Sequence, residues 1–121
     1  MTGNFNDATS IYLQIAAMLE DDILRGVLLE QERVPSTNEL ARAYSINPAT
    51  AAKGINLLVE EGILYKKRGI GMFVAQGAHD KIIAKRKDTF YDTYVTSLVR
   101  EARALGLTKE ELKAMIERAQ Q

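Results

Sequence analysis

Two helix starts lie so close together along the chain that they restrict the possible folds more than any other feature. Ser36 and Glu39 have the spacing of a capping box, in which each side chain accepts the backbone amide of the other residue. Asn47 followed by Pro48 is a second start, because asparagine caps helices and proline suits the first helical position. So short a connection makes consecutive helices cross steeply. The sequence therefore predicts a helix-turn-helix, with Ile46 in the turn and packed into the core.

The second of these helices is predicted to run to about Glu61 and to be ended by Gly62. Its inward positions are Ala51, Ile55, Leu58 and Val59. Gly54 lies in the interior of this helix, where glycine costs about 1 kcal/mol relative to alanine. We therefore expect Gly54 to permit the close approach of another helix.

A basic hairpin is predicted to follow. Residues 63–65 and 72–75 are short apolar and aromatic runs that favour β-strands, and residues 66–71, with the sequence KKRGIG, would form the hairpin tip. Residues 33–34 could add a very short strand. A hairpin in this position is a wing, so the fold class is mainly α with a small β-hairpin, a winged helix-turn-helix.

The flanking segments complete the domain organisation. Ser10 is predicted to cap a helix whose apolar stripe runs from Tyr12 to Ile23, Asp80 to cap a long helix to about Leu105, and Thr108 to open a last helix through a second capping box. We expect residues 10–76 to form a winged helix-turn-helix DNA-binding domain and residues 80–121 a two-helix dimerisation tail.

The tail is rich in aromatic and aliphatic side chains, and two interpretations are open. It either folds back to complete the core of the monomer or forms the seam of a dimer. A winged domain of about 65 residues is nearly self-sufficient, so a homodimer is favoured. The candidate dimerisation residues are Phe90, Tyr91, Tyr94, Val95, Leu98, Leu105, Leu112 and Ile116.

Composition excludes several classes of function. The chain has no cysteine and a single histidine, His79, so we expect neither a disulfide framework nor a metal site. No nucleophile, base and orienting group have a catalytic pattern, so we expect no enzyme and no cofactor. No run of about 18 apolar residues is present, so we expect no membrane span and a cytoplasmic location.

The net charge is zero, which argues weakly against nucleic acid, but the charge is unevenly distributed. Residues 66–87 carry Lys66, Lys67, Arg68, Lys81, Lys85, Arg86 and Lys87 against Asp80 alone. A neutral protein can thus present one basic edge to phosphate groups.

The side chains most suited to DNA lie on the second helix of the turn and on the hairpin. Ala49, Thr50, Ala52, Lys53 and Asn56 are predicted to point outward near the start of that helix, where base edges lie closest. The helix starts at Ser36 and Asn47 suit phosphate oxygens. The basic hairpin tip suits an adjacent minor groove. Taken alone, Lys53 and the basic hairpin are equally typical of a solvated surface, and Ser36 and Asn47 are caps for which phosphate binding would be an additional role.

Taken in order, several segments resemble the bacterial GntR family of transcription regulators. They are residues 11–15 (IYLQI), 34–41 (VPSTNELA), 46–50 (INPAT), 58–64 (LVEEGIL) and 68–74 (RGIGMFV). The short tail looks like the YtrA-like branch, in which two helices replace a large effector domain. The resemblance implies a homodimer on a palindromic operator, usually a repressor. It carries DNA contacts onto Thr37, Asn38, Asn47, Ala49, Thr50, Lys53, Arg68 and Gly69.

This sequence departs from the family pattern at Asn38 and Ala52, where the family commonly has arginine. The loss of two charge contacts in each subunit should lower DNA affinity and flatten the salt dependence by roughly 0.9 per missing phosphate contact. A different operator sequence is a further consequence.

We predict a sequence-specific regulator of transcription that binds double-stranded DNA. Its candidate contact residues are Ser36, Thr37, Asn38, Asn47, Ala49, Thr50, Lys53, Asn56, Lys67, Arg68, Gly69, Ile70 and Gly71. The alternative is a winged-helix module for protein–protein interaction that does not bind DNA, which the neutral net charge and the two missing arginines favour. Whether an unidentified small-molecule effector binds between the tail and the winged domain is left open, because no motif in the sequence marks such a site.

Overall fold

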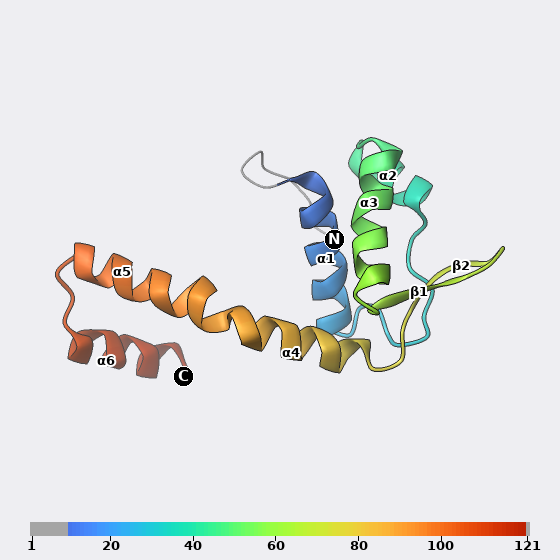
Figure 1. The fold of residues 1–121 in the computed structure, drawn as a ribbon. Helices are drawn as coiled ribbons and strands as arrows, with labels where there is room; N and C mark the ends of the chain where they lie inside the picture. The colour runs from blue at the N-terminus through green and yellow to red at the C-terminus, as the bar shows by residue number, and fades with distance from the viewer. Residues whose placement is uncertain (1–9, 121) are drawn as a thin grey trace. The chain divides into compact units, whose positions relative to one another are not determined.

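A computed structural model describes residues 10–120 of the chain. In chain order the elements are α1 (Ile11–Leu24), α2 (Thr37–Tyr44), α3 (Pro48–Glu60), β1 (Leu64–Lys67), β2 (Gly71–Val74), α4 (Ala78–Phe90), the π-helical stretch η1 (Tyr91–Val95), α5 (Thr96–Ala104) and α6 (Lys109–Ala119) (Figure 1). The chain forms two compact units, of which the first ends at Ala84 and the second begins at Lys85. We call them the winged unit and the tail.

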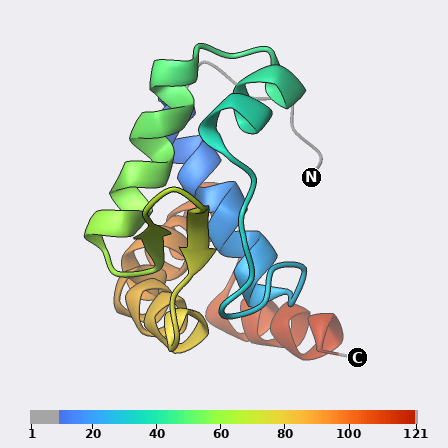
Figure 2. The same ribbon diagram turned by 90° about the vertical axis from the view of Figure 1, so that its right-hand side faces the viewer.

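In the winged unit, α1 and α2 both pack against α3 (Figure 2). The core contains fully buried side chains from each of these helices, from both strands and from the start of α4. They include Ile15, Leu19, Leu40, Ile55, Leu58, Leu64, Val74 and Ile82. The predicted fold class is confirmed, because the winged unit is a helix-turn-helix followed by a two-stranded antiparallel hairpin.

The turn between α2 and α3 has the predicted capping. Ser36 Oγ accepts the Glu39 amide at 3.1 Å, and Glu39 Oε1 accepts the Ser36 amide at 3.0 Å. Ser45, just after α2, is left-handed at φ 53°, and Asn47 Oδ1 then accepts the Ala49 amide at 2.8 Å to start α3. Ile46 is half-buried against the core between the helices.

Gly54 marks the closest approach of α3 to α1. A Cβ atom at this position would lie 2.8 Å from the carbonyl oxygen of Tyr12 and 3.0 Å from Cγ2 of Ile15. Any side chain would therefore push the two helices apart. The expected close approach at Gly54 is confirmed, and α1 is the helix that approaches.

The hairpin pairs Leu64 with Val74 and Lys67 with Gly71 at its two ends. The predicted tip at residues 66–71 is too long, because Lys66 and Lys67 belong to β1 and only residues 68–70 form the turn. The reason is the register of the hairpin, in which Lys66 pairs with Met72 and Lys67 with Gly71. A further backbone segment lies beside β2. Val34 donates its amide to Met72 O at 2.9 Å, and the short strand expected at residues 33–34 is a single bridge between Arg33 and Phe73.

The helix after the wing starts earlier than predicted and is not uniform. It begins at Ala78, so Asp80 lies inside its first turn and is not the cap. Glu30 instead supplies the cap, because its carboxylate accepts the amides of Gly77 at 2.8 Å and of His79 at 3.4 Å. Ala78 is consequently buried in the winged unit.

Further along, the expected single helix contains the π-helical stretch η1 at Tyr91–Val95. Two hydroxyl groups donate to carbonyl oxygens of the preceding turn there, Thr96 Oγ1 to Asp92 O at 2.6 Å and Ser97 Oγ to Thr93 O at 3.1 Å. Such bonds compete with the regular backbone pattern of a helix. The second predicted capping box is confirmed, with Thr108 and Glu111 capping each other at the start of α6.

Candidate nucleic-acid interface

The outward face of α3 is the first part of the candidate interface. Ala49, Lys53 and Asn56 are exposed, while the inward residues Ala51, Ile55 and Leu58 are buried and Val59 is half-buried. Thr50 and Ala52 are half-buried at the edge of this face. The exposed residues share a hollow of about 560 Å³ lined by Tyr12, Ala49, Ala52, Lys53, Asn56, Leu57 and Glu60. The structure thus brings the predicted side chains of α3 to one open surface.

The backbone at the start of α3 is already engaged. Asn47 Oδ1 holds the Ala49 amide, the Thr50 amide donates to Asn47 O at 3.0 Å, and proline at position 48 has no amide hydrogen. A phosphate oxygen would therefore meet the side chains and the positive end of this helix rather than free amides.

At the start of α2, the Glu39 carboxylate occupies the place that a phosphate would take. Hydrogen bonds from the Ser36 backbone amide and from its side chain hold the pKa of Glu39 below its usual value. Thr37 is half-buried and Asn38 is exposed on the same turn. Asn38 lines a second hollow, of about 400 Å³, together with Arg42 and Pro48. Arg42 therefore places a cation one helical turn after Asn38, where the family commonly has arginine.

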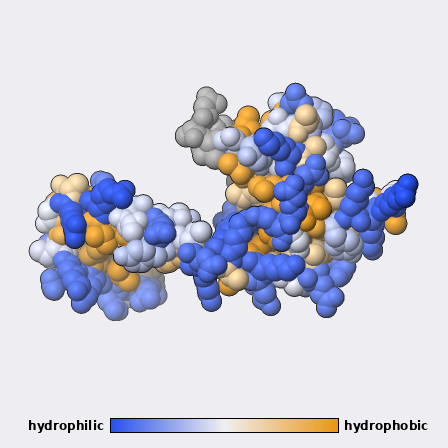
Figure 3. All heavy atoms as spheres, viewed as in Figure 1, coloured by the Kyte–Doolittle hydropathy of each residue, from blue (hydrophilic) through white to orange (hydrophobic). Residues whose placement is uncertain are grey.

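The wing carries the remaining predicted residues. Arg68, Gly69 and Ile70 form its exposed turn, closed by a hydrogen bond from the Ile70 amide to Lys67 O at 2.9 Å. Gly69 has φ 77°, a conformation that favours glycine. Figure 3 shows the wing, at the right of the view, as a projecting and largely hydrophilic hairpin.

Two cations, Lys67 of the wing and Arg33 from before α2, pack against residues of the wing. Lys67 Nζ lies 4.4 Å from the centre of the Phe73 ring, within the range of a cation–π interaction. Arg33 is not among the predicted DNA-binding residues, yet it lies against the wing. A Cβ atom added to Gly71 would lie 2.9 Å from Arg33 Nε. The predicted strand at residues 33–34 was the only signal in the sequence that could have placed Arg33 there.

The tail exposes apolar side chains. Tyr91, Tyr94 and Leu105 are 65%, 63% and 66% exposed, and Phe90 stacks on Tyr94 with ring centres 5.4 Å apart. Leu98 and Ile116 are also exposed, whereas Val95 and Leu112 are half-buried. Exposed apolar groups in this number are typical of surfaces that take part in protein–protein contacts.

Two further properties of the described residues bear on function. Between residues 10 and 120, no helix is long and apolar enough to cross a membrane. In the same part of the chain, no three acidic, histidine or cysteine side chains are grouped so that they could hold a metal ion.

Comparisons with known proteins match these features. The family model described as "Bacterial regulatory proteins, gntR family" matches residues 11–74. The chain is 33% identical over 112 residues to the uncharacterised HTH-type transcriptional regulator YhcF of Bacillus subtilis, covering 93% of this chain and 91% of that protein. It is 29% identical over 109 residues to the HTH-type transcriptional repressor YtrA of the same organism, covering 90% and 83%.

Solved structures of transcription regulators also resemble this chain. A GntR-family regulator from Bacteroides thetaiotaomicron aligns with a TM-score of 0.70 and 39% identity, covering 89% of this chain and 94% of that one. The DNA-binding domain of AraR in complex with operator ORX1 aligns with a TM-score of 0.54 and 30% identity, covering 62% of this chain and 92% of the AraR domain.

Proposed function

The chain belongs to the GntR family of bacterial regulatory proteins, and we propose that it represses transcription by binding a palindromic operator as a homodimer. It is a DNA-binding regulator of transcription and not an enzyme. The observation that carries the proposal is the open face of α3, with Lys53 and Asn56 exposed, in the same compact unit as a wing that exposes Arg68.

In this proposal α3 enters the major groove and the wing lies over the adjacent minor groove. Thr50 and Asn56 read base edges, Ala49 contacts thymine methyl groups, and Lys53 and Arg68 neutralise phosphates. Ser36, Thr37, Asn38 and Asn47, at the starts of α2 and α3, fix the register against the DNA backbone, and Lys67, Gly69, Ile70 and Gly71 shape the wing.

The homodimer would form through the tail. The exposed residues Phe90, Tyr91, Tyr94, Leu98, Leu105 and Ile116, with the half-buried Val95 and Leu112, supply an apolar seam that a second copy would bury. Two winged units related by a twofold axis then require two half-sites, with centres one helical turn or a multiple apart.

Repression is supported by the relatives, because YtrA carries the name of a repressor and aligns over most of both chains. A dimer bound to an operator would block transcription by occupying the DNA. It would act in the cytoplasm, where bacterial DNA lies. An effector of unidentified chemistry would release the repressor from DNA only if it bound the free protein more tightly than the DNA-bound protein.

Replacing Arg68 by alanine tests the role of the wing. We expect weaker binding to all DNA sequences and a salt dependence reduced by roughly 0.9 per subunit, because one phosphate contact is lost from each. Titrations at several salt concentrations measure both quantities. An unchanged affinity with an unchanged slope would remove the wing from the interface.

Replacing Thr50 by valine or Asn56 by alanine tests the reading of bases. We expect the preferred operator sequence to change, with each lost base contact costing about 1–3 kcal/mol of discrimination, while attraction to unrelated DNA stays the same. Selection of bound duplexes from a random pool shows this directly. An equal loss of affinity for every sequence would mean that these side chains contact only the backbone.

A further inference from the structure

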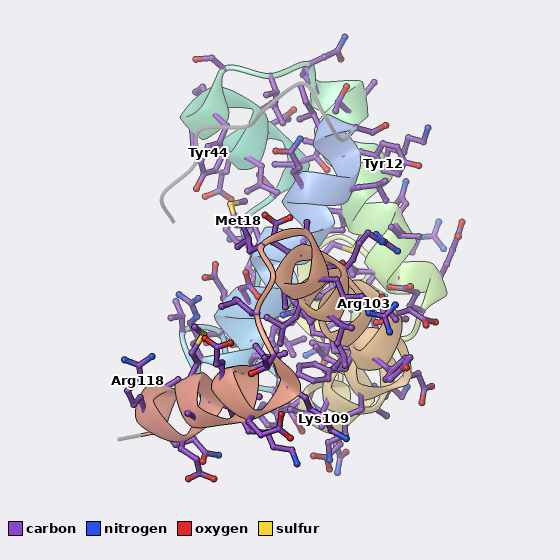
Figure 4. The ribbon with its side chains drawn as sticks, turned by 90° about the vertical axis from the view of Figure 1, so that its left-hand side faces the viewer. Tyr12, Met18, Tyr44, Arg103, Lys109 and Arg118 are labelled. Atoms are coloured by element: carbon purple, nitrogen blue, oxygen red, sulfur yellow. The ribbon has the colours of Figure 1, made fainter. Side chains whose placement is uncertain are left out.

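Lys53 is the only cation of α3, and its side chain is not free in solvent. Its Nζ atom lies 4.1 Å from the centre of the Tyr12 ring, which belongs to α1. A cation at this distance over an aromatic face is attracted by the ring electrons. Figure 4 shows Tyr12 on the side of α1 that faces α3.

The two helices can make this contact because they pack closely one residue further along α3. At Gly54 the missing side chain lets the Tyr12 carbonyl oxygen come within 2.8 Å of where a Cβ atom would be. The same close approach sets the Tyr12 ring beside Lys53 in the hollow on the outward face of α3. Tyr12 is half-buried and Lys53 is exposed, so the ammonium group keeps access to a ligand.

We propose that Tyr12 is a positioning residue for DNA binding, which holds the Lys53 ammonium against α1 so that it meets a phosphate rather than a base edge. The inference rests on the proposed function. Because α3 has no other cation and alanine at position 52, the placement of Lys53 sets the attraction between this helix and the DNA backbone.

The contact between Lys53 and Tyr12 favours a phosphate over a base as the partner of the Lys53 ammonium group. The side chain of Lys53 reaches toward the first turn of α1, and its ammonium group lies over the Tyr12 ring at the edge of the hollow that Ala49 and Asn56 also line. A lysine ammonium is a point charge without the paired donors that read a base edge, and once it is held against α1 it suits a phosphate oxygen. It therefore fixes position and not sequence.

The expected size of the effect follows from the strength of the contact. An exposed cation–π interaction favours the held conformer by a factor of about two to five, and removal of the ring lowers affinity by up to that factor for each subunit that engages DNA. The attraction itself remains, because the charge is still present.

The test is a double-mutant cycle with Tyr12→Leu, Tyr12→Phe and Lys53→Met. Affinities are measured for a duplex selected from a random pool by the wild-type protein and for a fixed duplex of unrelated sequence. We expect Tyr12→Leu to weaken binding to both duplexes by about two- to fivefold per subunit and to have no effect in the Lys53→Met background. Tyr12→Phe, which keeps the ring, should bind as the wild type does.

Three results would overturn the inference. An equal loss from Tyr12→Leu in both backgrounds would mean that the ring acts on the fold or on DNA by itself. A loss from Tyr12→Phe would point to the hydroxyl group. A change in the ratio of the two affinities would mean that Lys53 reads bases. Thermal unfolding of each variant shows whether a loss of binding comes from a loss of fold. If the folded wild-type protein enriched no duplex from the pool, the proposed function itself would be wrong.

Discussion

Replacing Tyr94 by aspartate is expected to convert the proposed dimer into monomers and to weaken operator binding by about 100-fold. The side chain is 63% exposed in the single chain and stacks on Phe90, so its substitution leaves the chain's own core intact. In the proposed dimer, the carboxylate would be buried in an apolar seam without a partner, which is costly. The loss of affinity is large because the second winged unit then no longer binds as part of the same molecule.

Sedimentation equilibrium and titration of a duplex with two half-sites measure the two effects. Thr93→Asp is a matched control, since it adds the same charge to η1, which also contains Tyr94, at an exposed polar position. The affinity of Tyr94→Asp for a single half-site should equal that of the wild type. A Tyr94→Asp protein that stays dimeric with unchanged operator affinity would show that the tail is not the dimer seam.

The Gly54→Val substitution is expected to destabilise the winged unit strongly. Its Cβ atom would lie 2.8 Å from the backbone oxygen of Tyr12 and 3.0 Å from Cγ2 of Ile15. Overpacking of this kind costs about 1–3 kcal/mol, and β-branching adds to the cost in a helix. We expect the melting temperature to fall by roughly 10 °C or more.

Thermal unfolding followed by circular dichroism checks this expectation. Ala43→Val is the matched control, because Ala43 is exposed in α2 and the substitution changes helix propensity without a clash. The control should lose less than about 1 kcal/mol. A Gly54→Val protein as stable as the control would mean that α1 and α3 separate without cost, and the reason for their close packing would be wrong.

Features with local causes could be predicted from the sequence. The capping boxes at Ser36 and Thr108 and the Asn47 cap depend on residues within three positions, and they occur where they were predicted. Gly54 was informative because glycine inside a helix needs a reason. These features were sufficient to identify the winged helix-turn-helix.

Features that depend on distant partners could not be predicted in the same way. The start of α4 is fixed by Glu30, which lies 47 positions before Gly77 along the chain. The segment around Val34 pairs with β2 by a hydrogen bond from the Val34 amide to Met72 O, between residues far apart along the chain. The positions of Arg33 against the wing and of Tyr12 beside Lys53 likewise follow only from the packing of separate elements.

Selection of bound duplexes from a random pool by the wild-type protein tests the central claim most directly. At low salt, we predict enrichment of a palindrome whose half-sites have centres about 34 Å apart or a multiple of that distance, as two winged units on one side of the duplex require. Binding to the enriched duplex should weaken steeply as salt rises. A folded protein that enriches no sequence would contradict the claim that this chain is a sequence-specific regulator.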